Sequence, residues 1–250
     1  VAYQTIVRTE IRRFTRIWVQ TMIPPAITMT LYFIIFGSLI GRRIGEMGGF
    51  DYMAYIVPGL IMMSVIINSY TNVSSSFFGS KFGRFIEEML VSPISNQTIL
   101  LGYVTGGVAR AMSVGIIVTI LSLFFTDLVI HNMFAVVSIT VLTAVLFSLL
   151  GFINGVYAKR FDDVSIVPTF VLTPLTYLGG VFFSIDLLPD FWAGVAQLNP
   201  ILYVVNAFRF GILGVSDISL GWAYGILISM TIVAYVIAVR LLANGAGVRS

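Results

Sequence analysis

YMAYIVPGLIMMSVIINSYTNVSSSFFGS, residues 52–80, contains no charged side chain. A helix that crosses the hydrocarbon of a bilayer needs about 20 consecutive, mostly apolar residues, and this stretch is long enough. Outward from it, four further charge-free runs cover residues 17–41, 128–158, 164–185 and 218–239. A sixth run, 89–126, is interrupted only by Arg110. The sequence therefore predicts six spanning helices.

The composition agrees with a membrane protein. Of the 250 residues, 58% are hydrophobic and 10% are charged, and the mean hydropathy is +0.99. A soluble domain of this composition would expose far too much apolar surface. The apolar runs are continuous rather than alternating, which disfavours a transmembrane barrel. We predict one all-α polytopic domain over residues 1–250, with spans at about 19–40, 53–77, 98–125, 134–157, 164–183 and 220–242.

The basic residues predict the orientation, because they are enriched on the cytoplasmic side of membrane proteins. With the N-terminus inside, ten of the 14 basic residues are cytoplasmic: Arg8, Arg12, Arg13, Arg16, Lys81, Arg84, Lys159, Arg160, Arg240 and Arg249. Arg42, Arg43 and Arg209 fall outside. We therefore expect a multi-pass protein with both termini cytoplasmic. Since these residues are spread over several loops, they do not indicate nucleic-acid binding.

Residues 1–18 predict an amphipathic helix. One side carries Tyr3, Ile6, Val7, Ile11, Phe14, Ile17 and Trp18. The other side carries Arg8, Arg12, Arg13 and Arg16. Such a helix lies at the membrane interface with its arginines toward lipid phosphates.

Residues 80–95, SKFGRFIEEMLVSPIS, separate the second and third predicted spans. An i, i+3, i+4, i+7 pattern of apolar residues predicts one helical face, formed by Phe82, Phe85, Ile86 and Met89. Arg84 and Glu88 are spaced to pair. Pro93 ends the helix, and Ser95 or Asn96 caps the next one. The segment is too short to span, so we expect a charged helix on the cytoplasmic surface.

Polar residues inside the spans leave alternatives open. The second half of the 52–80 run, from Asn68 to Ser76, is rich in polar side chains that face either protein or a wet pathway; interhelical hydrogen bonding without a transport role is an equal alternative. Arg110 lies near the middle of the third predicted span, where inserting an arginine into the membrane costs roughly 2.5–3.5 kcal/mol. Backbone carbonyls, Asn68, Asn154 or a bound anion are its candidate partners, and snorkelling or purely structural pairing is the alternative.

Prolines and glycines predict local irregularity and close packing. Pro168 and Pro174 predict a kink in the fifth span. Residues 186–215 are broken by Pro189 and Pro200 yet are too apolar for a solvated loop, which predicts a re-entrant or interfacial helical hairpin. Close helix contact is permitted by four Gly-x-x-x-Gly pairs: Gly37/Gly41, Gly102/Gly106, Gly151/Gly155 and Gly221/Gly225.

Several chemistries find no support in the sequence. There is no cysteine for thiolate metal sites, and no Gly-x-x-x-x-Gly-Lys-Ser/Thr loop for ATP. The paired carboxylates Glu87–Glu88 and Asp162–Asp163 lie in cytoplasmic turns. The lone His131 lies in a loop, so an intramembrane enzyme that depends on it is disfavoured. No predicted span holds an acidic residue, which disfavours ion coupling; an ATP-independent secondary transporter or channel remains the alternative reading.

Four stretches carry a family resemblance: RIWVQTMIPPAITMTLYFIIFG (16–37), YIVPGLIMMSVI (55–66), FDDVSIVPTFVLTPLTYLGGVFFS (161–184) and LNPILYVVNAFRFGILG (198–214). With the arrangement above, the chain resembles the membrane subunit of type-2 ABC exporters, bacterial inner-membrane permeases that share their fold with the ABCG half-transporters. The resemblance covers nearly the whole chain.

The resemblance implies a bacterial inner-membrane homodimer in which each copy docks one cytosolic ABC ATPase. ATP and Mg²⁺ would be bound by that partner, and this chain would hold no cofactor or metal and have no catalytic residue. Residues 1–18 correspond to the family's connecting helix, and 80–95 to its coupling helix. The resemblance assigns ATPase coupling to Lys81, Arg84, Phe85, Glu87 and Glu88.

The resemblance also implies a substrate path along the dimer axis, lined by the second and fifth spans. Carried onto this chain, the lining is Met62, Ile66, Asn68, Tyr70, Phe170, Thr173 and Tyr177. Residues 186–215 would form an outer lid. A neutral, aromatic lining suits an amphiphilic or hydrophobic substrate such as a drug, lipid or glycolipid, with glycans also open, and membrane lipids surround the dimer.

Overall fold

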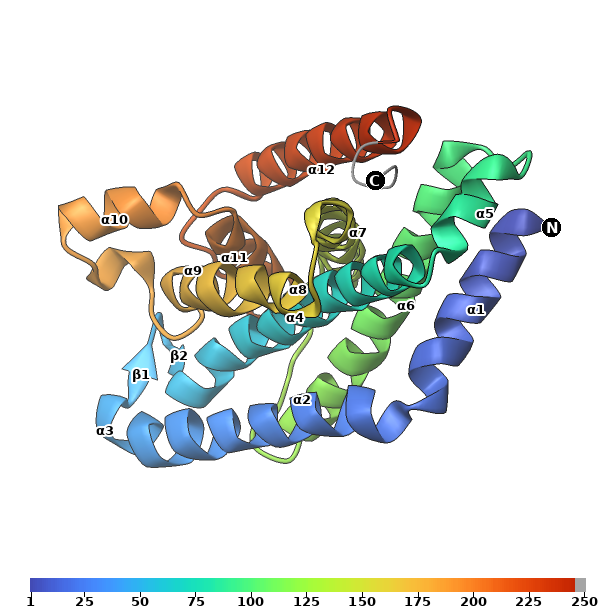
Figure 1. Cartoon of the computed structure of the whole chain (residues 1–250). Helices are drawn as coiled ribbons and strands as arrows, with labels where there is room; N and C mark the ends of the chain where they lie inside the picture. The colour runs from blue at the N-terminus through green and yellow to red at the C-terminus, as the bar shows by residue number, and fades with distance from the viewer. Residues whose placement is uncertain (246–250) are drawn as a thin grey trace.

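The computed structural model describes residues 1–245 and shows a helical bundle arranged around one central helix (Figure 1). The central helix is α4 (Tyr52–Phe82), and most of its side chains are buried. It packs mainly against α6 (Asn96–Ser122) and α7 (Met133–Tyr157). Arg249, counted above among the cytoplasmic residues, lies outside the described residues.

Within the described residues, five helices are long and apolar enough to cross a membrane: Trp18–Ile44, Tyr52–Phe82, Asn96–Ser122, Met133–Tyr157 and Leu220–Ala243. They correspond to five of the six predicted spans. The first comprises α2 (Trp18–Tyr32), a π-helical stretch (Phe33–Ile40) and α3 (Gly41–Ile44). The last is α12.

The fifth predicted span, 164–183, differs from the other five. The helix here runs from Phe161 to Leu178 in three pieces: α8 (Phe161–Val167), a π-helical turn (Pro168–Leu172) and α9 (Thr173–Leu178). The winding changes from α to π at Pro168, and the Thr173 hydroxyl donates to the Pro168 carbonyl at 2.9 Å. The predicted kink at Pro168 and Pro174 stays a prediction. This run is not among the five long helices, so the count of six spans stays a prediction.

Glycines set the closest helix contacts. A Cβ at Gly151 of α7 would lie 2.3 Å from the Tyr70 carbonyl oxygen, so α7 packs directly on the backbone of α4. A Cβ at Gly106 of α6 would lie 2.5 Å from Glu10 Cβ, in the helix α1 (Ala2–Arg16). In contrast, Gly221 and Gly225 of α12 face open space. Of the four glycine pairs, the α12 pair therefore makes no close contact with other residues of 1–245.

The N-terminal helix α1 packs lengthwise on α6 and is joined to α2 by a break at Ile17 (Figure 1). Of its predicted apolar side, Phe14 is buried and Ile6 and Val7 are half-buried, whereas Tyr3, Ile11, Ile17 and Trp18 are exposed. The predicted division of its faces is wrong for Arg13, which turns inward to α4 rather than outward with the other arginines. The cause is a buried acidic residue, Glu10, that pairs with it.

The two ends of the bundle differ in their elements (Figure 1). One end holds the start of α1, the end of α12 and the short helix α5 (Phe85–Val91). The other holds a hairpin of two strands, β1 (Glu46–Met47) and β2 (Phe50–Asp51), which is a small departure from the predicted all-α fold. The predicted broken hairpin lies there too. It contains a 3₁₀ turn (Ile185–Leu187), α10 (Asp190–Gln197) and α11 (Pro200–Leu213).

Candidate functional site at the α5 end

The charged segment 80–95 is shorter as a helix than predicted. The helix α4 continues to Phe82, and Arg84 then adopts a left-handed conformation, φ 60°, before α5 begins at Phe85. This break turns Phe82 and Phe85 outward, so the predicted apolar face of four residues does not form; only Ile86 of that set is buried. Ser95 caps α6 by accepting the Thr98 backbone N–H at 3.2 Å, as predicted.

Four of the five residues predicted to contact an ATPase are exposed: Arg84, Phe85, Glu87 and Glu88. Phe85 is 62% exposed, one of several phenylalanines at the surface of the chain. The single ion pair among residues 1–245 is Arg13–Glu10, so the predicted pairing of Arg84 with Glu88 does not occur.

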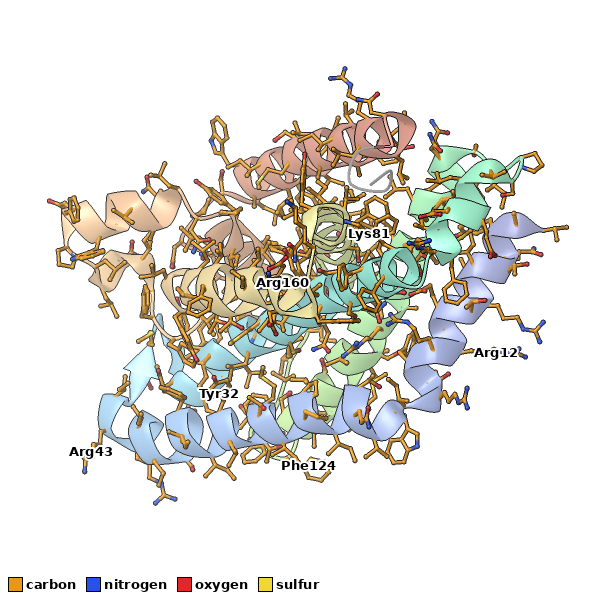
Figure 2. The ribbon with its side chains drawn as sticks, viewed as in Figure 1. Arg12, Tyr32, Arg43, Lys81, Phe124 and Arg160 are labelled. Carbon is orange, nitrogen blue, oxygen red and sulfur yellow. The ribbon has the colours of Figure 1, made fainter. Side chains whose placement is uncertain are left out.

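The fifth residue, Lys81, is placed differently. Its Nζ donates to the carbonyl oxygens of Val156 at 2.7 Å and Ala158 at 2.8 Å, beside the end of α7 (Figure 2). The last carbonyls of a helix have no partner inside the helix and attract a cation. Lys81 therefore joins α4 to the C-terminal end of α7, and its charge is already used within the chain.

An aromatic cluster extends the exposed surface from α4 to α8. Phe161 packs edge-on against Phe78, with ring centroids 4.9 Å apart, and against Phe82 at 5.0 Å. Phe78 is buried, whereas Phe82 and Phe161 are both more than 60% exposed. The start of α8 and the end of α4 thus present adjacent aromatic side chains.

A buried polar network ties α1 to α4. The Glu10 carboxylate accepts from the Ser76 hydroxyl at 2.6 Å and from Arg13 at 3.2 Å. Arg13 Nη2 also donates to Asn72, to its backbone oxygen at 3.0 Å and to Oδ1 at 2.9 Å. Burial raises the pKa of Glu10, although Arg13 and Ser76 act in the opposite direction. The network fixes the angle at which α1 meets the bundle.

Arg110 meets the same network. Its guanidinium donates to Asn72 Oδ1 at 3.5 Å, a long contact. The partners predicted for it, Asn68 and Asn154, are used elsewhere: Asn68 donates to the Ser64 carbonyl of its own helix, and Asn154 to Ser74 and Val164. The sequence signal for Glu10 was present, because Glu10 lies four residues from both Ile6 and Phe14 and so falls on the apolar side of α1.

The residues predicted to line a substrate path fall into two groups. Those on α4 are buried inside the single chain: Met62, Ile66, Asn68 and Tyr70. Those of the fifth predicted span lie at its surface, with Phe170 73% exposed, Tyr177 exposed and Thr173 half-buried. The Tyr177 hydroxyl contacts that of Tyr32 on α2 at 2.8 Å. The structure does not bring the two groups onto one open surface of the chain.

An apolar cavity of about 350 Å³ separates α4 and α7 from the Phe161–Leu178 run. Its walls include Tyr70, Phe147, Leu172 and Leu175, and Asn154 is one of its few polar residues. Tyr70 is thus a predicted lining residue that borders this cavity. A space of this size and composition suits an apolar chain or ring.

At the opposite end, Arg209 of α11 is 0% exposed. Its Nη2 donates to the Gly180 carbonyl at 2.5 Å, and its guanidinium carbon lies 3.9 Å from the centre of the Tyr55 ring. Asn199 caps α11 by accepting the Ile201 N–H at 3.0 Å, and Gly214 ends the helix at φ 77°. Arg209, predicted only as an outside residue, therefore fastens the hairpin to the start of α4.

Comparisons with known proteins agree with this arrangement. The family model of the ABC-2 type transporter matches residues 1–213. The inner membrane transport permease YadH of Escherichia coli (strain K12) is 60% identical over 250 residues, which is 100% of this chain and 98% of the relative. Nodulation protein J of Rhizobium meliloti (strain 1021) is 23% identical over 215 residues, 85% of this chain and 81% of the relative. The chain belongs to the ABC-2 type transporter family, as a multi-pass inner-membrane permease subunit.

Proposed function

We propose that this permease subunit acts as a homodimeric exporter of an amphiphilic or hydrophobic substrate, driven by a separate cytosolic ATPase that binds ATP and Mg²⁺. The observation that carries the proposal is the exposed α5 segment, at the end of the bundle that holds the start of α1 and the end of α12 (Figure 1). Family membership implies a cooperating ATP-binding subunit, and this end is its proposed docking site.

The docking surface combines an apolar anchor with charges. Phe85 and its neighbour Phe82 are exposed, and Glu87 and Glu88 flank them on α5. Buried aromatic anchors dominate the energy of protein interfaces, whereas charges at the rim set orientation. We assign Lys81 a positioning role, because its amine holds the α4–α7 junction. A displacement of α5 would then be transmitted directly to α4, and through Lys81 to α7.

The proposed substrate path runs along the face of the Phe161–Leu178 run, where a second copy would complete it. Phe170 and Tyr177 would form its wall, with Thr173 at its edge. The α4 residues Met62, Ile66, Asn68 and Tyr70 would form a second layer, reached when the proline-kinked run moves. The apolar cavity beside Tyr70 supports a hydrophobic or amphiphilic cargo, and residues 186–215 would act as the outer lid.

The proposal is tested by reversing charge on α5. The double variant Glu87→Lys with Glu88→Lys should reduce copurification of the ATP-binding subunit and abolish ATP-driven transport, while the melting temperature in detergent stays unchanged. Glu46→Lys, a change at an exposed acid of the opposite end, is the matched control. Full coupling in the double variant would contradict α5 as the docking site. Gradient-driven flux by the purified chain alone would show instead an ATP-independent carrier or channel.

A further inference from the structure

Two arginines converge on one amide in the interior of the bundle. Arg13 of α1 and Arg110 of α6 both donate to Asn72 Oδ1, at 2.9 Å and 3.5 Å. Guanidinium groups only donate hydrogen bonds, so this shared contact fixes the orientation of the Asn72 carboxamide. The nitrogen of that carboxamide must then be the remaining donor. Asn72 is 0% exposed.

Three donors in this cluster have no acceptor. Arg13 Nε, Arg110 Nε and Asn72 Nδ2 are buried, and none has a hydrogen-bond partner among residues 1–245. Buried donors without partners are rare in proteins, and each costs about 1–3 kcal/mol. All three belong to side chains that already meet at one point, so a single acceptor group placed there could serve them together.

The charges of the cluster do not balance. Glu10 is its only carboxylate, and both of its oxygens are occupied, Oε1 by Ser76 and Oε2 by Arg13. Two guanidiniums against one carboxylate leave an excess of one positive charge in a largely buried site. An excess charge removed from water is strongly unfavourable unless it is paired. The missing group is therefore an anion that accepts hydrogen bonds.

The cluster is open at one edge. The Arg13 side chain is 35% exposed. The exposed Ser75 donates to the same Asn72 backbone oxygen that Arg13 contacts, at 3.2 Å. Arg8, Arg12 and Arg16 are exposed along α1, and Arg12 projects away from the bundle (Figure 2). An anionic group at the membrane surface would meet this basic helix first and Arg13 next.

We propose that Arg13, Arg110 and Asn72 form a binding site for a phosphate group between α1, α4 and α6, supplied by an anionic phospholipid. The guanidinium fork suits phosphate oxygens, and the binding of one such group would satisfy the three free donors and balance the charge. A bound headgroup would also brace α1 against α4. The site is independent of the proposed transport cycle, since it needs neither the ATPase nor the substrate.

The first test measures lipid retention. The purified protein is exchanged into nanodiscs that contain phosphatidylcholine and phosphatidylglycerol, and native mass spectrometry counts the phosphatidylglycerol that stays bound. Wild type and Arg43→Gln, a control at an exposed arginine of the opposite end (Figure 2), should retain it. Arg110→Gln should bind it about tenfold more weakly, the effect of one charge-assisted hydrogen bond. Equal retention by wild type and Arg110→Gln would overturn the proposal.

The second test introduces a negative charge into the site by substitution. Asn72→Asp places a carboxylate between the two guanidiniums, so it should keep or raise the melting temperature and abolish phosphatidylglycerol retention. Asn132→Asp, at the N-cap of α7 where a carboxylate is tolerated, controls for the added charge. Retention by a folded Asn72→Asp protein would contradict the site even if Arg110→Gln failed to fold.

A third experiment distinguishes a lipid headgroup from free phosphate as the ligand of this site. Inorganic phosphate is added to protein in neutral detergent without anionic lipid. Stabilisation of wild type, but not of Asn72→Asp, together with no lipid retention, would assign the site to a free anion and overturn the lipid source. A lack of response to both lipid and phosphate would remove the site altogether.

Discussion

The two ends of α4 are held by arginines in opposite ways. At the start of the helix, Arg209 is fully enclosed, with its guanidinium over the Tyr55 ring and a bond to the Gly180 carbonyl. Toward its other end, Asn72 meets Arg13 and Arg110 in a network that is partly exposed and short of acceptors. Arg209 Nη1 also lacks a partner among residues 1–245, so the two ends differ in enclosure rather than in hydrogen bonding. A fully packed side chain resists motion more than a partly exposed one. The comparison indicates a rigid end at Arg209 and an adjustable end next to α5.

The largest expected effect is a difference in stability between substitutions of Arg209 and Arg110. Arg209→Met should destabilise the protein by about 3–5 kcal/mol, because it removes a desolvated cation–π contact and strands the Gly180 carbonyl. Arg110→Met should change stability by less than about 1 kcal/mol, since it removes one long contact. Thermal unfolding in detergent compares them. Equal losses in the two variants would break the contrast between the ends.

Glycine substitutions sharpen the same contrast. A Cβ at Gly59 would lie 2.8 Å from the backbone of Val181 at the Arg209 end, whereas a Cβ at Gly106 would lie 2.5 Å from Glu10 Cβ. Gly59→Ala should therefore cost about 1–3 kcal/mol through overpacking. Gly106→Ala should cost less, because the partly exposed helix α1 can shift as a whole and carry Glu10 Cβ with it. Gly221→Ala, which points into open space, is the control. A greater loss for Gly106→Ala than for Gly59→Ala would reverse the assignment.

The smallest expected effect depends on pH and concerns the adjustable end. Because burial raises the pKa of Glu10, folding favours its protonated form. Its contribution to stability is therefore full below about pH 4.3, the ordinary glutamate pKa, and is lost as the pH rises through the raised value. Glu10→Gln should remove this part of the pH dependence of the melting temperature, and Glu46→Gln, an exposed acid, should not. An unchanged profile in Glu10→Gln would show that burial of the carboxylate is not costly.

Much of the architecture could be predicted from the sequence, since membrane spans depend on length and apolarity alone. Five spans match their predicted ranges within a few residues, and a π-helical turn begins at Pro168, one of the two prolines predicted to kink the fifth span. The break at Gly83–Arg84 was not predicted, because the i, i+3, i+4 pattern across it continues uninterrupted. A glycine followed by a left-handed residue overrode that pattern.

The polar contacts were predictable only in part. The pairing of Lys81 with the end of α7 joins residues 75 positions apart, and such contacts are set by tertiary packing. The inward position of Glu10 was encoded in its spacing from Ile6 and Phe14, but its charge argued for the solvent side. The predicted roles of Arg84, Phe85, Glu87 and Glu88 in coupling, and of the path residues, remain predictions for the experiments above.

The docking of an ATP-binding subunit on α5 is tested most directly by cross-linking, which is favoured by the absence of cysteine from the chain. A single Glu88→Cys variant, expressed with the ATP-binding subunit and treated with a short bifunctional reagent in intact membranes, should form a covalent adduct with that subunit. Asp190→Cys, at the opposite end, should form none. An adduct through Asp190→Cys, or none through Glu88→Cys while the complex still copurifies, would contradict the assignment of α5 as the docking site.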